Sequence, residues 1–506
     1  MEKTANNNNI RLQYIIVLFA AATLYYMSVA PGILWQDSGL AQIRVLTHDF
    51  TGKLGLALAH PLYYLIAHLF QLLPFKDSAF KTNLVSAIFG ALTVANTYLV
   101  LTLLLKNLPS RQVATTIGTL SLALAHTFWQ HCALAEVYSV SSFLITCELL
   151  ALIKFTHTNN VFWYLLTWLL NGIECSNHML ATITLAAIII WTITLIRRKI
   201  VRLHWIPLAF FLWIIGAIPY EYLGVQAWLS GQPINDVIHS MLFGRYQKQV
   251  LNTHLNLRLL LSSAAIIGLN FPTPNIVLIP IGITKARNSI NKTIYNLLLL
   301  ATVFHLIFAF RYSVPDQYTF FILPVLFLSI WIGLGAAWLI NKSSKAKLPL
   351  ILFALIPPAF YAVLPTIIHR YIPTIGSAPI PFRDEAKYFF QPWKTGYDGP
   401  QKLAEELFKI APKNAIVIAD GTSSRPLRYY QLAYKKRTDL KIISSPFAHE
   451  PINIKIQKMK SLIKHNAVFI IRPYRRYCPD WILNNFKLKK IDSIYKITEF
   501  NDKNTN

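Results

Sequence analysis

Residues 317–340 read QYTFFILPVLFLSIWIGLGAAWLI, a stretch without a single charged side chain. A helix needs about 20 mostly apolar residues to cross the hydrocarbon core of a bilayer, so this stretch predicts a transmembrane helix. Similar apolar runs recur up to residue 368, and 54% of the 506 residues are hydrophobic. We therefore expect a polytopic α-helical membrane protein.

Apolar stretches separated by polar breaks predict about eleven transmembrane helices. They cover residues 12–30, 82–105, 113–128, 136–153, 161–174, 178–196, 204–224, 258–283, 293–310, 317–340 and 348–368. Residues 60–73, HPLYYLIAHLFQLL, are apolar but too short for a crossing. They predict a helix that lies on the membrane surface.

The distribution of charge predicts the orientation of the chain. Lys and Arg collect in alternate polar breaks, as in RRKIVR at 197–202, whereas acidic residues such as Asp37, Glu136 and Glu174 collect in the other breaks, the outer loops. Under the positive-inside rule the amino terminus is cytoplasmic, and an odd number of spans places the carboxyl terminus outside. The net charge of +26 then favours anionic membrane lipid as a partner, and no nucleic acid.

A second domain is expected after the last span. The linker PTIGSAPIPFRDE at 373–385 is rich in Pro, Gly and Ser, and beyond it the apolar runs are short. Helices and strands alternate up to residue 473, and a hairpin is predicted at 486–500. We predict a transmembrane domain at 1–381 and an extracytoplasmic α/β domain at 382–506 built on a small parallel layer.

The four cysteines do not show metal-ligand spacing. Four free thiols are the favoured interpretation, and a single disulfide between Cys132 and Cys175 is the alternative. No residue is predicted to be a metal ligand.

The charged residues lie mainly in the outer loops, and Glu148 is the only clear acid inside a span. An ion-coupled transporter should carry acids and bases at mid-depth in the membrane, so this pattern favours chemistry at the membrane surface. A loop carboxylate can accept a proton from a nucleophile, and nearby cations can stabilise a departing phosphate. The pattern therefore suits a reaction on an anionic, lipid-linked substrate.

Several motifs resemble, in order, those of the domain-of-unknown-function 2723 family. WQDSG at 35–39 with AHPLYYL at 59–65 is similar to its DSGE and HPPGYPLY pattern, and FWQHCALAEVYSVSSF at 128–143 resembles its AEVY signature. GIECSNHMLAT at 172–182, RYSVPDQYTFFILP at 311–324 and PKNAIVIADGTSSRPLRYYQ at 412–431 resemble its later motifs. Leu40 stands where the family has a second acid.

The resemblance implies a GT-C glycosyltransferase, related to the animal protein O-mannosyltransferases of the transmembrane protein 260 type. Such enzymes transfer a sugar from a polyprenyl-phosphate donor at the extracytoplasmic face, which in a bacterium is the outer side of the inner membrane. The implied reaction inverts the sugar, with Asp37 as the base. The acceptor could be protein, lipid or glycan, with protein O-glycosylation among these, and a divalent cation, Mg or Mn, is an open option.

The site residues follow from the loop positions and the resemblance together. Asp37, Glu136 and His60 are predicted to be catalytic. Eight further residues are predicted to bind substrate: Ser38, Gly39, Arg44, Tyr138, His178, Arg245, Arg311 and Asp316. Phosphate neutralisation is expected from Arg245 or Arg311 with His60 or His178.

Structural alternatives stand beside these roles. Asp37, Ser38 and Gly39 could form a helix cap, and the arginines could be interfacial side chains that reach for water. At the level of the whole protein, the alternatives are a transporter or flippase of lipid-linked glycans and a non-catalytic scaffold. Both predict that activity survives the change Asp37→Asn.

Overall fold

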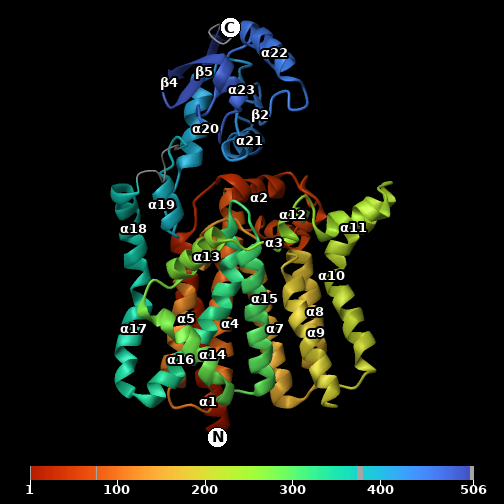
Figure 1. The fold of residues 1–506 in the computed structure, drawn as a ribbon, viewed down its shortest axis with the longest axis vertical. Coiled ribbons are helices and arrows are strands. Elements are labelled where there is room, and N and C mark those ends of the chain that lie inside the picture. The colour runs from red at the N-terminus through yellow and green to blue at the C-terminus, as the bar shows by residue number, and fades with distance from the viewer. Residues whose placement is uncertain (1, 76, 373–379, 502–506) are drawn as a thin grey trace.

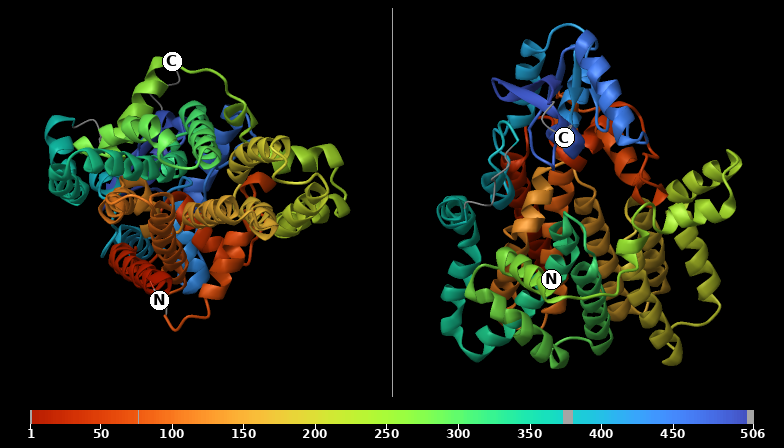
Figure 2. Two further views of the ribbon diagram at one scale, coloured as in Figure 1. Left: turned by 90° about the horizontal axis from the view of Figure 1, so that it is seen from below. Right: turned by 45° about the horizontal axis from the view of Figure 1, so that its top comes forward.

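The computed structural model describes residues 2–75, 77–372 and 380–501, with side chains from residue 9 onward. A bundle of helices forms one part, and an α/β domain is stacked on one end of it (Figure 1). Helix α1 (Glu2–Ser28) begins at the opposite end of the bundle. Figure 2 shows from two further directions that the α/β domain covers only part of that end.

Six helices of the described residues are long and apolar enough to cross a membrane. These candidate spans are Asn9–Ser28 in α1, Ser78–Leu104 (α4), Tyr138–Thr158 (α7), Trp205–Leu229 (α10), Lys292–Arg311 (α15) and Gln317–Lys342. The count reaches 8 if each of two bent pairs is one span. The fold is thus a polytopic helical membrane protein, as predicted, but with six to eight candidate spans in place of about eleven.

The remaining predicted spans correspond to helices that are too short for this test. Helix α5 (Arg111–Ala123) has 13 residues and is followed after a break by α6 (His126–Ala133). Helices α8 (Val161–Asn177) and α9 (Ala181–Arg197) have 17 residues each. A hydropathy window measures the length of an apolar run and does not detect where the helix within it breaks, so the predicted spans and these helices differ in number.

The bent pairs explain two further predicted spans. The first joins α13 (Leu257–Asn270) to the helical segment Pro274–Asn288 at 116°, and the second joins Ser344–Leu355 to α18 (Pro357–Tyr371) at 44°. The first segment contains η2 (Pro274–Val277), α14 (Leu278–Lys285) and η3 (Ala286–Asn288), and the second contains η5 (Ser344–Ala346) and α17 (Lys347–Leu355). Proline stands at the start of η2 and of α18, where its missing N–H costs nothing.

The stretch 317–340 lies at the centre of the bundle. It forms η4 (Gln317–Phe321) and α16 (Ile322–Lys342), and its apolar window is buried along its whole length. Close packing depends on small residues: a Cβ on Gly335 would lie 2.2 Å from the carbonyl oxygen of Leu278 in α14. An apolar helix with no polar face is expected to be surrounded by other helices.

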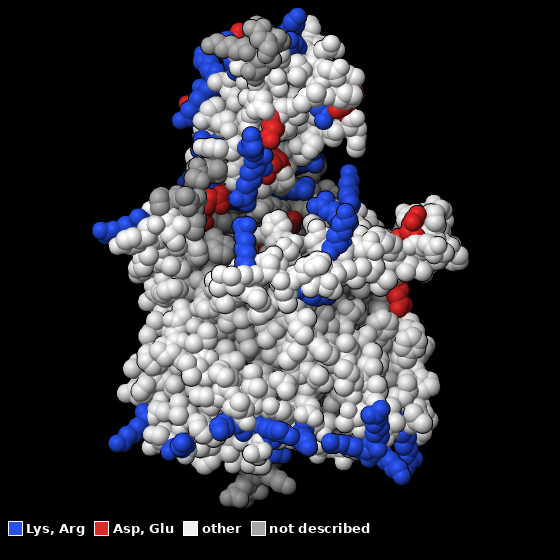
Figure 3. All heavy atoms as spheres, viewed as in Figure 1, with Lys and Arg blue, Asp and Glu red and all other residues white. Residues whose placement is uncertain are grey.

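Short helices cover the end of the bundle that faces the α/β domain. They are α2 (Gln36–Leu46), η1 (Leu56–Leu58), α3 (Pro61–Phe70), α11 (Ile234–Leu242) and α12 (Gln247–Val250). Helix α3 confirms that residues 60–73 form a short helix, although its position in a membrane stays a prediction. Lys and Arg line the other end of the bundle, as Figure 3 shows.

The carboxyl-terminal domain has a five-stranded sheet with the order β2-β1-β3-β5-β4. Its strands are β1 (Ile416–Ile418), β2 (Lys441–Ile443), β3 (Val468–Ile470), β4 (Phe486–Ile491) and β5 (Ile494–Phe500). Its helices are α19 (Glu385–Phe390), α20 (Gly399–Ile410), α21 (Ser424–Ala433), α22 (Ile452–His465) and α23 (Asp480–Asn485). Strand β1 pairs in parallel with β2 and β3, and the predicted hairpin adds two antiparallel strands to the same sheet.

A shared apolar core joins this domain to the loop before α2. Ile33 and Trp35 belong to the same buried cluster as Leu403 and Tyr429. The indole Nε1 of Trp35 donates to the Tyr397 hydroxyl at 2.7 Å. The Tyr429 hydroxyl accepts from the amide of Ala79, at the start of α4, at 2.9 Å. The domain is therefore docked firmly over α2.

The cysteines are all free thiols, so the alternative of a disulfide between Cys132 and Cys175 is wrong. Both side chains are buried in the bundle, where a small apolar group packs well.

Candidate active site at the junction of the two domains

Helix α2 presents Asp37 in its first turn, directly after the buried Trp35. The position before the helix is held by Trp35 without a side-chain cap, so neither Asp37 nor Ser38 caps α2. The Ser38 hydroxyl instead donates to Glu136 Oε1 at 2.8 Å. This bond brings the first predicted motif together with the loop between α6 and α7.

Three carboxyl groups gather around this contact. Burial raises the pKa of Glu136 to about 8, and the charges of Asp37 and Asp316 add to that rise, whereas the Ser38 hydrogen bond opposes it. Burial, with the charge of Asp37, also raises the pKa of Asp316 to about 6. Acids that raise one another's pKa in a partly dehydrated setting are typical of sites that move protons.

The Asp37 side chain is accessible to solvent although other parts of the protein surround it. Its side chain is exposed, yet burial by the two surrounding domains raises its pKa, and the charges of Arg425 and Arg245 oppose the rise. These observations agree if the carboxylate faces a narrow space between the domains, and Figure 3 shows a hollow there with basic and acidic atoms beside it. A carboxylate in this position is a stronger base than one in bulk water.

A pair of stacked histidines lies beside the carboxyl group cluster. The His60 and His178 rings stack at 4.8 Å between centroids, and the His178 ring lies 5.1 Å from that of Tyr138. The charges of Asp37, Glu136 and Asp316 all act on the Tyr138 hydroxyl, so this tyrosine connects the two groups.

The two imidazoles are neutral near pH 7. Burial lowers the pKa of His60 to about 4, and it lowers that of His178 well below the usual value. His60 Nδ1 lies 2.7 Å from the Asn177 carbonyl oxygen, and His178 Nδ1 accepts from the amide of Leu180. Neutral rings can hydrogen bond to a substrate but do not supply the positive charge expected of them for phosphate neutralisation.

The three predicted arginines have different surroundings. Arg44 is buried, donates to the carbonyl oxygens of Asp49 and Ala59 at 3.0 and 2.9 Å, and lies over the Tyr64 ring. Arg311 donates to the Asn252 carbonyl oxygen at 2.7 Å. These two therefore hold loops in place.

Arg245 is the predicted arginine whose charge acts on Asp37. Its side chain is exposed, and its Nη2 donates to the neighbouring Tyr246 hydroxyl at 3.2 Å. It is therefore available to an anion that enters the space near Asp37.

Glu174, placed in an outer loop by the sequence, is inside the bundle. It belongs to α8, is fully buried and lies beside Glu148 of α7. Asn171 donates to Glu148 Oε1 at 3.3 Å, and Trp213 donates to Asn171 at 3.0 Å. The bundle thus holds a pair of buried acids where one was predicted.

Two residues of the carboxyl-terminal domain belong to the surroundings of the site and were missed. The charge of Arg425, in α21, acts on Asp37, and Glu136 acts electrostatically on Tyr388 of α19. The motif at 412–431 contains Arg425, but nothing in the sequence indicates that it faces the loop at 35–39. The spatial approach is visible only in the folded chain.

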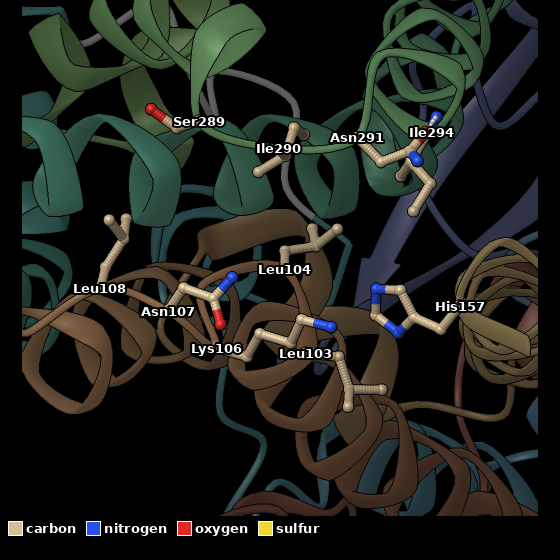
Figure 4. A pocket seen from close by; sticks show the side chains of 10 residues that line it. All are labelled: Leu103, Leu104, Lys106, Asn107, Leu108, His157, Ser289, Ile290, Asn291 and Ile294. Atoms are coloured by element: carbon tan, nitrogen blue, oxygen red, sulfur yellow. Dashed lines mark hydrogen bonds between the residues drawn. The ribbon is translucent and has the colours of Figure 1, made fainter.

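Among the described residues, no three His, Cys, Asp or Glu side chains come close enough together to hold a metal ion. Participation of Mg or Mn stays a prediction. A cavity of about 230 Å³ lies elsewhere, at the carboxyl end of α4 and the start of α15. It is lined by Leu103, Leu104, Lys106, Asn107, Leu108, His157, Ser289, Ile290, Asn291 and Ile294, none of them an acid or a predicted site residue (Figure 4).

Comparisons with known proteins found one family model and similar solved structures. Residues 54–201 match the family model described as the protein O-mannosyl-transferase TMEM260 N-terminal domain. That segment contains His60, Glu136 and His178 and excludes Asp37. No curated protein matches the chain significantly.

Two crystal structures of ArnT from Cupriavidus metallidurans share the fold. The structure bound to undecaprenyl phosphate has a TM-score of 0.58 and 11% identity, and covers 96% of this chain and 97% of that chain. The apo structure has a TM-score of 0.56 and 10% identity, with 98% of each chain covered. The chain therefore has an ArnT-like fold along almost its whole length.

Proposed function

We propose that the protein is an integral membrane glycosyltransferase of the GT-C type. It transfers a sugar from a polyprenyl-phosphate donor to an acceptor hydroxyl at the extracytoplasmic face, with inversion. The observation that carries the proposal is the group of Asp37, Glu136 and Asp316 beside Arg245 at one end of the helical bundle. The ArnT-like fold supports the donor class, since one ArnT structure is bound to undecaprenyl phosphate.

The mechanism follows from the charges around Asp37. The acceptor hydroxyl attacks the anomeric carbon of the sugar while its proton passes to the Asp37 carboxylate. The bond between that carbon and the phosphate oxygen breaks, and its electron pair stays on the phosphate. Arg245 stabilises the added negative charge. One displacement at one carbon inverts its configuration.

His60 and Glu136 have supporting roles in this proposal. The protonated carboxyl of Glu136 can donate a hydrogen bond to a sugar or phosphate oxygen without adding negative charge. The neutral His60 ring donates from Nδ1 to the Asn177 carbonyl oxygen, so its Nε2 can accept a hydrogen bond from a sugar hydroxyl. Ser38, Tyr138 and His178 complete the polar lining near them. The match to the O-mannosyl-transferase family model favours a protein hydroxyl as the acceptor.

The orientation in the membrane is part of the proposal. Lys and Arg gather at the end of the bundle opposite the α/β domain, which supports a cytoplasmic location for that end. The active site and the carboxyl-terminal domain then lie outside the cytoplasm, in the periplasm of a bacterium.

Sugar transfer by purified protein in lipid nanodiscs tests the proposal. Synthetic polyprenyl-phosphate sugars are supplied with peptide, lipid or glycan acceptors, and wild type is compared with Asp37→Asn. We expect a loss in turnover of about 100- to 10,000-fold, the contribution of a positioned general base. Asp236→Asn, which changes an exposed acid in α11, is the matched control and should retain activity. Equal rates for wild type and Asp37→Asn refute the catalytic assignment.

A second candidate function is supported by the buried acids Glu148 and Glu174. Acids inside a helical bundle are typical of transporters, and a flippase of lipid-linked glycans would use them for gating or coupling. That function predicts that lipid translocation survives Asp37→Asn and is lost in Glu148→Gln. Reconstituted vesicles with a fluorescent lipid-linked glycan distinguish the two functions.

A further inference from the structure

The first turn of helix α21 in the carboxyl-terminal domain lies directly on α2. A Cβ added to Gly39 would lie 2.8 Å from the Cβ of Arg425 and 2.4 Å from the Leu34 carbonyl oxygen. Only glycine permits so close an approach. The close contact places Arg425 above the turn of α2 that carries Asp37.

Arg425 has no hydrogen bond or ion pair within the described part of the chain. Its Nε is buried without a partner, and its side chain is half-buried. The charges of Arg428 and Asp37 act on it, but Asp37 does not lie within the 4.0 Å of an ion pair. A partly dehydrated guanidinium without a partner is unfavourable unless an anion binds to it.

Asp420, the other acid near Arg425, is already occupied. Its carboxylate accepts hydrogen bonds from the amides of Thr422 and Ser423 at 2.9 and 3.0 Å and from the Ser423 hydroxyl. It therefore fixes the turn before α21 and leaves the guanidinium of Arg425 free. Since the acid is engaged by that turn, Arg425 is available to attract an anion, and the charge of Arg428 also acts at this position.

The topology of the sheet independently indicates a binding position at the same place. Strand β1 lies between β2 and β3 in the sheet. The chain passes from β1 through α21 to β2 on one side of β1, and then through α22 to β3 on the other side. In open α/β sheets, ligands bind at the carboxyl ends of the strands where the connections diverge. Here α21, the helix that follows the carboxyl end of β1, contacts α2, so that edge of the sheet lies toward Asp37.

We propose that Arg425 binds the phosphate of the lipid-linked donor, together with Arg245 of the membrane domain. The two guanidinium groups belong to different domains, and both act on Asp37. A guanidinium can bind two phosphate oxygens at once and keeps its charge at any physiological pH. When the bond from the anomeric carbon to the phosphate oxygen breaks, the new negative charge lies between these groups. The carboxyl-terminal domain thus supplies part of the active site.

This inference rests on the proposed function, and binding of undecaprenyl phosphate to the full-length protein in nanodiscs tests it. We expect Arg425→Ala to weaken binding by about 10- to 100-fold, the loss expected for a charge-assisted hydrogen bond, and to raise the donor KM. Arg425→Lys should restore part of the affinity, because it returns the charge but not the planar fork. Undecaprenol, which has no phosphate, should bind all variants alike.

Gln431→Ala is the matched control on the same helix. Gln431 carries no charge and donates to the carbonyl oxygens of Arg437 and Leu440 at 2.8 and 2.9 Å. Its removal tests whether any damage to α21 weakens binding. Unchanged binding in Arg425→Ala, or equal losses in both variants with an equal fall in the unfolding temperature, overturns the inference.

The outcomes separate this inference from the proposed function. If wild type binds undecaprenyl phosphate through Arg425 but transfers no sugar, the glycosyltransferase assignment fails and the phosphate site stands. If wild type transfers sugar and Arg425→Ala keeps the same donor KM, the assignment stands and the role of Arg425 is refuted.

Discussion

The alkaline limit of activity should be set by Glu136. Its pKa of about 8 means that it is mostly protonated at neutral pH, beside the carboxylate of Asp37. Loss of that proton at higher pH adds a negative charge next to Asp37 and Asp316, which repels the donor phosphate. At low pH Asp37 is protonated and cannot act as the base, and burial raises this limit above its usual value. We expect a bell-shaped dependence of kcat/KM on pH.

The change Ser38→Ala should move the alkaline limit of activity to higher pH. The Ser38 hydroxyl, 2.8 Å from Glu136 Oε1, stabilises the ionised carboxylate and so lowers its pKa. Without this bond the pKa of Glu136 rises further. A hydrogen bond to a charged group contributes about 1.5–3 kcal/mol. Because one pKa unit corresponds to about 1.4 kcal/mol, the alkaline limit should move up by about 1–2 pH units.

The assay is the initial rate of sugar transfer at low donor concentration across about pH 5 to 10. Glu136→Gln imitates the protonated acid, so it should remain active at pH 7 and lose the alkaline limit altogether. Asp236→Asn, far from this cluster in sequence and exposed, should reproduce the wild-type profile. An unchanged alkaline limit in Glu136→Gln, or a shift to lower pH in Ser38→Ala, refutes the reasoning.

Two further predictions concern the loops that build the site. Gly39→Ala should separate α21 from α2 and raise the donor KM, because the new methyl group would lie 2.8 Å from Arg425 Cβ. The control Gly32→Ala places its methyl group where no atom lies within 4 Å, so the donor KM should stay that of wild type. Arg44→Ala should destabilise the protein by about 2–4 kcal/mol, since buried carbonyl oxygens lose their donor and the contact with the Tyr64 ring is lost. Thermal unfolding monitors the second variant, and an unfolding temperature equal to that of wild type contradicts the prediction.

The helical architecture could be predicted because each membrane helix depends on the composition of one continuous stretch of sequence. A helix that crosses a membrane needs a continuous apolar run, and the run at 317–340 became the buried centre of the bundle. The strands and helices of the second domain also followed the predicted order. The bounds of the individual helices could not be predicted, because a break such as the one between α5 and α6 leaves the apolar composition almost unchanged.

The site was predicted only in part, because side-chain neighbours depend on tertiary packing. The resemblance and the loop positions selected Asp37, Glu136 and Asp316, and the structure brings these three together. Glu174 was misplaced because the polar sequence around it is typical of a loop, although α8 continues to Asn177. Arg44 was predicted to bind substrate because it is a cation near Asp37, and its bonds to backbone carbonyl groups could not be inferred from its position in the chain.

The basicity of Asp37 depends on the docking of the two domains. Covering the carboxylate removes water and raises its pKa, whereas the same docking brings Arg425 near and lowers it. The net result is a raised pKa, which makes the Asp37 carboxylate a better base than a hydrated one in the proposed mechanism. Arg245 belongs to the membrane domain, so its charge acts on Asp37 whether or not the carboxyl-terminal domain is docked. The charge of Arg425 and the burial by the second domain are present only after docking. The separation of Asp37 and Arg425 in the sequence therefore has a physical consequence: the site is complete only when the carboxyl-terminal domain has folded onto α2.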